Sequence, residues 1–142
     1  MAADDSIFTR IIKGQIPCVK VFESSHVFAF LDVNPLAVGH TLVVPKRQVV
    51  RLDELPAEEG AEVGRCLGKI ARAVLIASGC TDYNVLQNNG PTAGQVVPHV
   101  HFHIIPRRHG DGLGYRWNPQ KATPQDLAAI GARIADAFRP VA

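Results

Sequence analysis

The sequence predicts a single α+β domain built around an antiparallel sheet. The chain has 142 residues, which suits one core and is short for two. Hydrophobic residues make up 46% and charged residues 20%, a balance that fills a core and still leaves a charged surface. Short β-type runs and helical segments follow one another, and no repeat, low-complexity tract or linker separates them. We therefore expect one domain over residues 1–142.

Composition and charge exclude several classes of protein. The net charge of +2 and the pI of about 8.6 lack the dense basic clusters of a nucleic-acid binder, but they leave small anionic ligands plausible. Charged residues interrupt every early apolar run, which predicts a soluble cytoplasmic protein without a membrane partner. Three cysteines without a C-x-x-C pair predict buried thiols in a reducing compartment: Cys18, Cys66 and Cys80.

The first half of the chain predicts one helix and three strands. Ser6 can cap a short helix with apolar residues on one face, and Gly14 ends it. The runs VKVF and HVFAFL flank the turn residues 23–25, as in a hairpin. A polar, bend-rich connection then precedes TLVVP, a buried strand that ends at a proline.

The second half predicts two helices and two strands. A helix begins near Pro56, keeps the three- and four-residue apolar period to Ser78, and stops at Gly79. The strand YNVLQ follows, then the loop NNGPTAGQ and a β run over residues 99–106. A last helix is expected over residues 124–138.

Three histidines alternate with apolar residues in this last strand. Alternate residues of a strand share a face, so the imidazoles of His99, His101 and His103 should lie on one side of the sheet. A zinc site is one interpretation. The outer two Cα atoms would be ~13 Å apart on a strand, too far for all three rings to bind one ion through bonds of ~2.1 Å. Two of them with a remote ligand remain an open alternative.

Nucleophilic catalysis on phosphorus is the interpretation that we favour. A histidine attacks phosphorus and the resulting phosphoramidate is later hydrolysed, which splits one displacement into two. His101 has a histidine on either side and is the expected nucleophile, while His99 and His103 contact phosphoryl oxygens or move protons. The loop of residues 88–95 supplies glycine N–H groups and side-chain amides that suit a phosphate.

These motifs resemble the histidine triad (HIT) family. The resemblance rests on HVHFHIIPR, on the Gly-Gln pair before it, on GHTLVVPK, and on IIKGQIP, FAFLD and NNGPTAGQ. It implies an α+β fold in which a helix and a strand pair with a second copy, giving a homodimer with a continuous sheet. It also implies a hydrolase that cleaves purine nucleoside phosphate derivatives at the α-phosphorus, either dinucleoside polyphosphates or nucleoside phosphoramidates. The nucleotidyl group passes to His101 and then to water, and no cofactor is needed.

The resemblance assigns further residues to the site. Asp32 stands where the family binds ribose hydroxyls, although a turn Asp also caps its own backbone. Asn88 and Gln95 match amides near the phosphate, with a turn amide as the alternative, and His40 matches a histidine that supports the triad. The other expected nucleotide contacts are Gly94, Val96, Phe8, Ile12, Phe28 and Leu31, of which the last four are also what a core contains. His26 and His109 match nothing catalytic and should lie on the surface.

The chain also departs from the family pattern. Several microbial members hold zinc with a C-x-x-C pair, a histidine after the P-K-R segment and a triad histidine. Here Ser6, Thr9 and Gln48 take the first three positions, so we expect no metal of that kind. Val96 stands where many relatives carry a hydroxyl that contacts phosphate.

Two hypotheses remain open beside this one. A non-catalytic nucleotide-binding scaffold is the alternative function, although the triad retains every imidazole that the attack needs. In the segment 106–120, Arg107 and Arg108 could attract an anionic leaving group while Trp117 adds an apolar surface; the alternative is a solvated basic turn with the tryptophan packed on its own domain.

Overall fold

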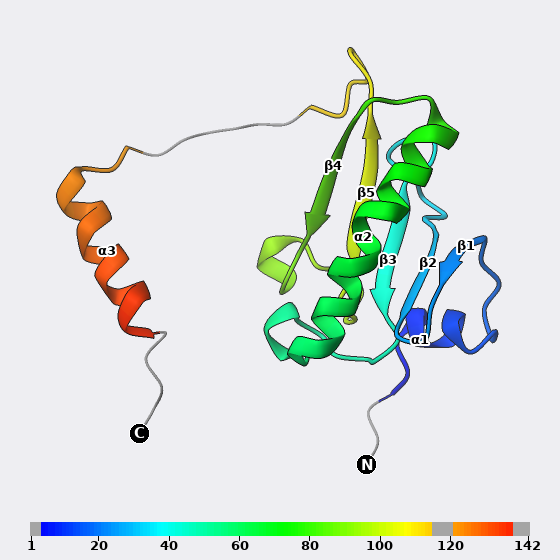
Figure 1. The fold of residues 1–142 in the computed structure, drawn as a ribbon, viewed down its shortest axis with the longest axis horizontal. Helices are drawn as coiled ribbons and strands as arrows, with labels where there is room; N and C mark the ends of the chain where they lie inside the picture. The colour runs from blue at the N-terminus through cyan, green and yellow to red at the C-terminus, as the bar shows by residue number, and fades with distance from the viewer. Residues whose placement is uncertain (1–3, 115–120, 138–142) are drawn as a thin grey trace. The chain divides into compact units, whose positions relative to one another are not determined.

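The described residues of the computed structural model are 4–114 and 121–137. Five antiparallel strands form one sheet in the order β1-β2-β3-β5-β4 (Figure 1). The strands are β1 (Lys20–Glu23), β2 (Val27–Leu31), β3 (Thr41–Pro45), β4 (Asp82–Gln87) and β5 (Phe102–Arg107). The antiparallel α+β architecture predicted from the sequence is confirmed.

Helices cover the two faces of the sheet. The long helix α2 (Ala57–Ser78) lies across one face (Figure 1), and the short α1 (Ile7–Ile12) packs on the other. The α2 face buries Val27, Ala29, Val43 and Ile104 of the strands. The α1 face buries Phe8, Phe28, Phe30, Leu42 and Val44. Both faces of β2 and β3 are therefore covered, which explains why these strands are apolar without alternation.

The ends of the helices follow the expected local chemistry. Ser6 caps α1 by accepting a hydrogen bond from the N–H of Thr9, and Gly14 follows with φ +78°. Gly79 caps α2 in the left-handed region, with φ +71°, and donates its N–H to the carbonyl of Leu75. Both boundaries agree with the sequence.

One strand is shorter than predicted. The sequence favours a β run from His99, but β5 begins at Phe102. The N–H of His99 bonds to the carbonyl of Val97, and the N–H of Val100 bonds to Val49, so the chain bends here before it joins the ladder. His99 and His101 therefore lie in the approach to the strand. Two 3-10 turns, η1 (Leu52–Glu54) and η2 (Pro91–Ala93), were not anticipated.

The chain forms two compact units, residues 1–112 and 113–142. The second contains α3 (Pro124–Ala137), whose first turn is closed by reciprocal bonds between Thr123 and Asp126. One domain over residues 1–142 stays a prediction.

Surface and burial agree with several sequence expectations. Cys66 and Cys80 are buried free thiols and Cys18 is half-buried. His26 and His109 are exposed. Among the described residues, no helix is long and apolar enough to cross a membrane.

Candidate active site

A cavity of about 590 Å³ opens on the α1 side of the sheet, beside the histidine row. Its wall comes from α1, the end of β2, the loop after β2, the end of β4 and the loop before β5. Eight of the predicted site residues line it: Phe8, Leu31, Asp32, Asn88, Gly94, Val96, His101 and His103. The opposite face carries an apolar groove of about 530 Å³ without a histidine or carboxylate in its lining. The chemistry therefore belongs to the first cavity.

His101 presents a free nitrogen lone pair to the cavity. Its Nδ1 lies 2.7 Å from the carbonyl oxygen of His99. Because a carbonyl only accepts, Nδ1 carries the proton and Nε2 is left unprotonated in the neutral ring. Burial lowers the pKa of His101, so the neutral form prevails near pH 7. The ring of Phe8 stands edge-on to it at 4.9 Å and limits its rotation.

His103 has the opposite tautomer. The N–H of Leu36 donates to His40 Nδ1 at 3.0 Å, so the proton of neutral His40 is on Nε2. His40 Nε2 then donates to His103 Nδ1 at 2.9 Å, which leaves the proton of His103 on Nε2. Burial, with the neighbouring His101 and His40, lowers the pKa of His103 to about 4. The cavity thus meets a lone pair from His101 and an N–H from His103.

Asp32 closes this chain of contacts. Its Oδ2 lies 3.7 Å from His40 Nε2, but burial lowers the pKa of His40 more than Asp32 raises it, so the imidazole stays neutral. Its Oδ1 accepts the N–H of Asn34 at 2.8 Å, the local cap that the sequence offered as an alternative. The same carboxylate lines the cavity and has acceptor capacity left for a ligand.

The position of His99 differs from the sequence prediction. It was expected to contact phosphate, but its ring is completely buried and does not line the cavity. Nε2 donates to the carbonyl of Pro45 at 2.8 Å, so Nδ1 is the acceptor and receives the hydroxyl of Ser6 at 2.7 Å. Both ring nitrogens are engaged, and His99 reaches the site only through its backbone carbonyl.

The side chain of Gln95 also differs from the prediction that it contacts the phosphate. Its Oε1 accepts the N–H of Gly90 at 2.7 Å, and its Nε2 donates to the carbonyls of Val50 and Val97. This buried amide fixes the loop before β5 and is not part of the cavity wall, as the turn-amide alternative proposed.

Gly94 and Val96, which precede β5, both line the cavity. Gly94 has φ +92°, a left-handed backbone conformation that favours glycine, and it lies beside Asn88 in the cavity wall. Val96 is 90% exposed at the cavity wall.

The apolar wall differs from the prediction in two residues. Phe28 and Ile12 pack in the cluster under α1 and do not line the cavity, whereas Phe30 and Ile11 do. Phe28 and Phe30 share one face of β2, so alternation could not tell which reaches the cavity. The sequence also missed several wall residues: Ile7, Ile16, Pro17, Cys18, Leu36 and Val97.

Comparison with known proteins decides the family. The HIT domain model matches residues 13–110. The chain belongs to the HIT family.

Relatives in this family resemble nearly the whole chain. Adenosine 5'-monophosphoramidase hnt1 of Schizosaccharomyces pombe is 42% identical over 94% of this chain and 98% of its own length. Adenylylsulfatase HINT3 of Arabidopsis thaliana is 41% identical over 78% of this chain and 56% of its own. The crystal structure of a HIT family member from Bacillus subtilis has a TM-score of 0.91 at 40% identity, covering 97% of this chain and 100% of that one. Since both of these relatives are named as hydrolases, the prediction that the chain is a HIT-type hydrolase is confirmed.

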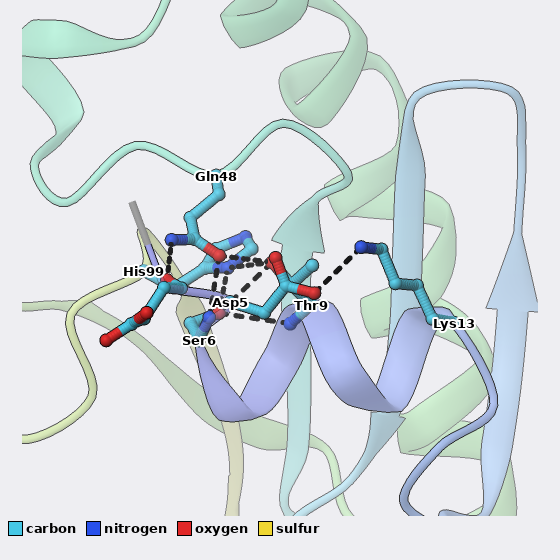
Figure 2. A network of polar contacts seen from close by, with 7 residues as sticks. Asp5, Ser6, Thr9, Lys13, Gln48 and His99 are labelled. Carbon is cyan, nitrogen blue, oxygen red and sulfur yellow. Dashed lines mark hydrogen bonds and ion pairs between the residues drawn. The ribbon is translucent and has the colours of Figure 1, made fainter. Parts of the chain in front are cut away.

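The positions that hold zinc in some HIT proteins come together here without a cysteine. Ser6, Thr9 and Gln48 form a hydrogen-bonded cluster around the Nδ1 side of His99 (Figure 2). Among the described residues, the group with the geometry for a metal ion is Asp32, His40 and His103, whose ligand atoms lie within 4.8 Å of one another. In that group, His40 Nε2 and His103 Nδ1 are already engaged in a hydrogen bond with each other.

The two arginines after the triad are engaged with neighbouring residues of their own chain. Arg107 makes a two-pronged pair with Asp111 at 2.8 and 3.0 Å and donates to Asn84 at 2.7 Å. Arg108 donates to the carbonyl of Ser78 at the end of α2. The basic-turn alternative describes this geometry, and Trp117 lies outside the described residues.

Proposed function

We propose that this HIT protein hydrolyses purine nucleoside phosphate derivatives, with adenosine 5'-phosphoramidate as the first substrate to test. The observation that carries the proposal is the pair of opposite tautomers, a lone pair on His101 Nε2 beside an N–H on His103 Nε2. The relative named adenosine 5'-monophosphoramidase supports this choice among the leaving groups. Dinucleoside polyphosphates are the second substrate class.

The first step forms a covalent intermediate. His101 Nε2 attacks the α-phosphorus while the bond from phosphorus to the leaving nitrogen breaks. With a phosphoramidate protonated on nitrogen, the leaving group departs as a neutral amine. The ring becomes a nucleotidyl-imidazolium. Its Nδ1–H stays hydrogen-bonded to the carbonyl oxygen of His99. Positive charge on the ring strengthens that hydrogen bond.

The second step restores the enzyme. Water attacks phosphorus, the bond from phosphorus to Nε2 breaks, and its electron pair returns to the ring, while the water gives one proton to solvent. His103 is neutral and its Nδ1 already accepts from His40, so its Nε2–H acts as a fixed hydrogen-bond donor to a phosphoryl oxygen. It need not lose this proton in either step.

The remaining cavity residues suit a nucleoside. Asp32 can accept two vicinal ribose hydroxyls, and Phe8, Phe30 and Leu31 offer an apolar surface to a purine base. Asn88 and Gly94 line the same cavity, and the Asn88 amide can donate to a phosphate there.

We also propose a homodimer with a continuous sheet, located in the cytoplasm. The edge strand β4 supports the dimer, since Tyr83, Val85 and Leu86 are each 39–45% exposed on it. Buried free thiols agree with a reducing compartment. Sedimentation equilibrium of the purified protein tests the dimer.

The function is tested by incubating the purified protein with adenosine 5'-phosphoramidate and measuring AMP. Wild type should turn over, His101→Ala should lose activity while still binding AMP, and a chelator should change nothing. Mass spectrometry of wild type quenched at neutral pH should find the adenylyl group on His101. Full activity in His101→Ala, or an adduct on another residue, would reject the mechanism. AMP binding without any turnover by wild type would favour the scaffold alternative.

A further inference from the structure

In the cluster of Ser6, Thr9, Gln48 and His99 at the start of α1, the hydrogen-bond partners determine which groups donate and which accept (Figure 2). Gln48 Nε2 donates to the backbone carbonyl of Asp4 at 2.8 Å, so its Oε1 faces α1. That oxygen accepts the N–H of Ser6 at 2.7 Å and the hydroxyl of Thr9 at 2.6 Å. The hydroxyl hydrogen of Thr9 is therefore committed to Gln48.

This commitment leaves the Ser6 hydroxyl for His99. Ser6 Oγ accepts the N–H of Thr9 at 3.0 Å as the helix cap. Its own hydrogen has two possible acceptors, Thr9 Oγ1 at 3.2 Å and His99 Nδ1 at 2.7 Å. The shorter contact goes to the imidazole, and His99 cannot donate there because its one proton bonds to Pro45.

The cluster is linked to the nucleophile through one residue. His99 is held at both ring nitrogens, by α1 on one side and by the end of β3 on the other, with no exposed surface. The carbonyl of this anchored residue accepts Nδ1–H of His101 at 2.7 Å. The direction of that bond places the lone pair of His101 on Nε2. Gln48 and Ser6 are 53 and 95 residues from His101 along the chain, so no local turn explains the arrangement.

We propose that Ser6, Thr9 and Gln48 are positioning residues for catalysis: they anchor His99 so that its carbonyl holds the neutral His101 in the tautomer that attacks phosphorus. This inference rests on the proposed function for its kinetic test only. The three side chains are not among the residues that line the cavity. They act by keeping one backbone carbonyl in place, as the outer hydrogen bonds of a catalytic histidine usually do.

The alternative is that the cluster only docks α1. The exposed ion pair between Lys13 and Asp5 at 2.7 Å provides the matched control, because it joins the two ends of α1 while its side chains are bonded to each other and not to the side chains of Ser6, Thr9 or Gln48 (Figure 2). Thr9 provides a second control. Thr9→Val keeps the shape of the side chain and removes the donor to Gln48, whereas Thr9→Ser keeps the donor.

The experiment combines turnover of adenosine 5'-phosphoramidate with ¹⁵N NMR of the histidine rings in the ligand-free protein. We expect Ser6→Ala to lower kcat roughly 10-fold or more, with KM within about twofold, because a displaced nucleophile affects the reaction and not the binding. Thr9→Val should lower kcat less, and Thr9→Ser and Lys13→Ala should match wild type. In the spectra, wild-type His101 should be the Nδ1–H tautomer, and Ser6→Ala should shift it toward a mixture.

Several results would overturn the proposal. These are a wild-type kcat in Ser6→Ala, a loss of equal size in Lys13→Ala, or a change confined to KM. An Nε2–H tautomer of His101 in the wild-type spectrum would reject it without any turnover. That measurement also separates this proposal from the proposed function, since an inactive wild type with the expected tautomer would reject only the latter.

Discussion

The two outer histidines of the triad occupy contrasting surroundings. On the buried flank, His99 is sealed between Ser6 and Pro45 and has no exposed surface. On the cavity flank, His103 is held from behind by His40 and keeps its Nε2–H for a ligand. The same residue type, two positions either side of the proposed nucleophile His101, therefore lies in different surroundings. One ring is hydrogen-bonded at both nitrogens in the interior, and the other lines the cavity.

The comparison shows that a hydrogen-bond chain can set a tautomer from either direction. On the buried flank a carbonyl of β3 accepts from the ring, which makes Nδ1 an acceptor. On the cavity flank a backbone N–H donates to His40, and the consequence passes through two rings to His103. Both chains begin at backbone groups, whose donor or acceptor character is invariant.

The largest effect is expected on the cavity flank. His103→Ala removes the N–H that faces the phosphoryl oxygens, so kcat should fall by about 10²–10³-fold, the usual cost of losing one fixed donor. Stability should fall less than at a fully buried position, because His103 borders an open cavity and its loss removes one acceptor, that of His40 Nε2–H. His26→Ala, at an exposed position, is the control. Steady-state kinetics and urea unfolding measure the two effects, and a loss of stability without a loss of kcat would remove the contrast.

On the buried flank the effects are expected to reverse. His99→Ala leaves a void and strips Ser6 of an acceptor and Pro45 of a donor, so the free energy of unfolding should fall by about 3 kcal/mol. Urea denaturation followed by circular dichroism measures it. If the variant is as stable as wild type, the anchoring role of His99 is wrong.

The sequence predicted the triad but not this division of labour. Alternation placed His99, His101 and His103 on one side; Phe8 of α1 contacts the rings of His99 and His101, and His103 lies next to His101 at the cavity. What separates them is Ser6, which lies 93 residues before His99 and reaches it only when α1 packs on the sheet. Contacts between distant segments also decided which of Phe28 and Phe30 lines the cavity, and they engage the Gln95 amide with the carbonyl of Val50, 45 residues earlier. By contrast, local signals such as Ser6, Gly79 and TLVVP gave their helix and strand boundaries correctly.

A third prediction concerns pH. Burial lowers the pKa values of His40, His99, His101 and His103 below the ordinary value of 6.5, so the folded state binds fewer protons than the unfolded chain in the acid range. Stability is therefore full above pH 6.5 and is lost as the pH falls toward the folded pKa, about 4 for His103. Each such histidine adds a slope of at most about 1.4 kcal/mol per pH unit.

The pH range from 6.5 to 5 shows this effect best, because the ordinary pKa of histidine lies at its upper end and those of Asp and Glu, about 3.9 and 4.3, lie below it. Urea unfolding should show stability declining across this range in wild type and less steeply in His103→Gln. His109→Gln, at an exposed position, should keep the wild-type slope. A flat profile in wild type would mean that the triad is not held neutral by the fold.

The smallest effect is expected at the far end of β5, which extends the contrast along the strand. Arg107 is six residues beyond His101, about 20 Å along an extended chain, and its guanidinium is neutralised by Asp111. Charges separated by more than the Debye length of about 10 Å at 0.1 M salt are largely screened. Replacing Arg107 and Arg108 together by alanine should therefore change the ratio of kcat/KM for diadenosine tetraphosphate to that for adenosine phosphoramidate by less than about twofold. The variant should lose some thermal stability, because the contacts to Asp111, Asn84 and Ser78 are removed. A selective loss on the polyphosphate, relieved by added salt, would show instead that these arginines attract the leaving group and that the site extends beyond the cavity on the α1 face.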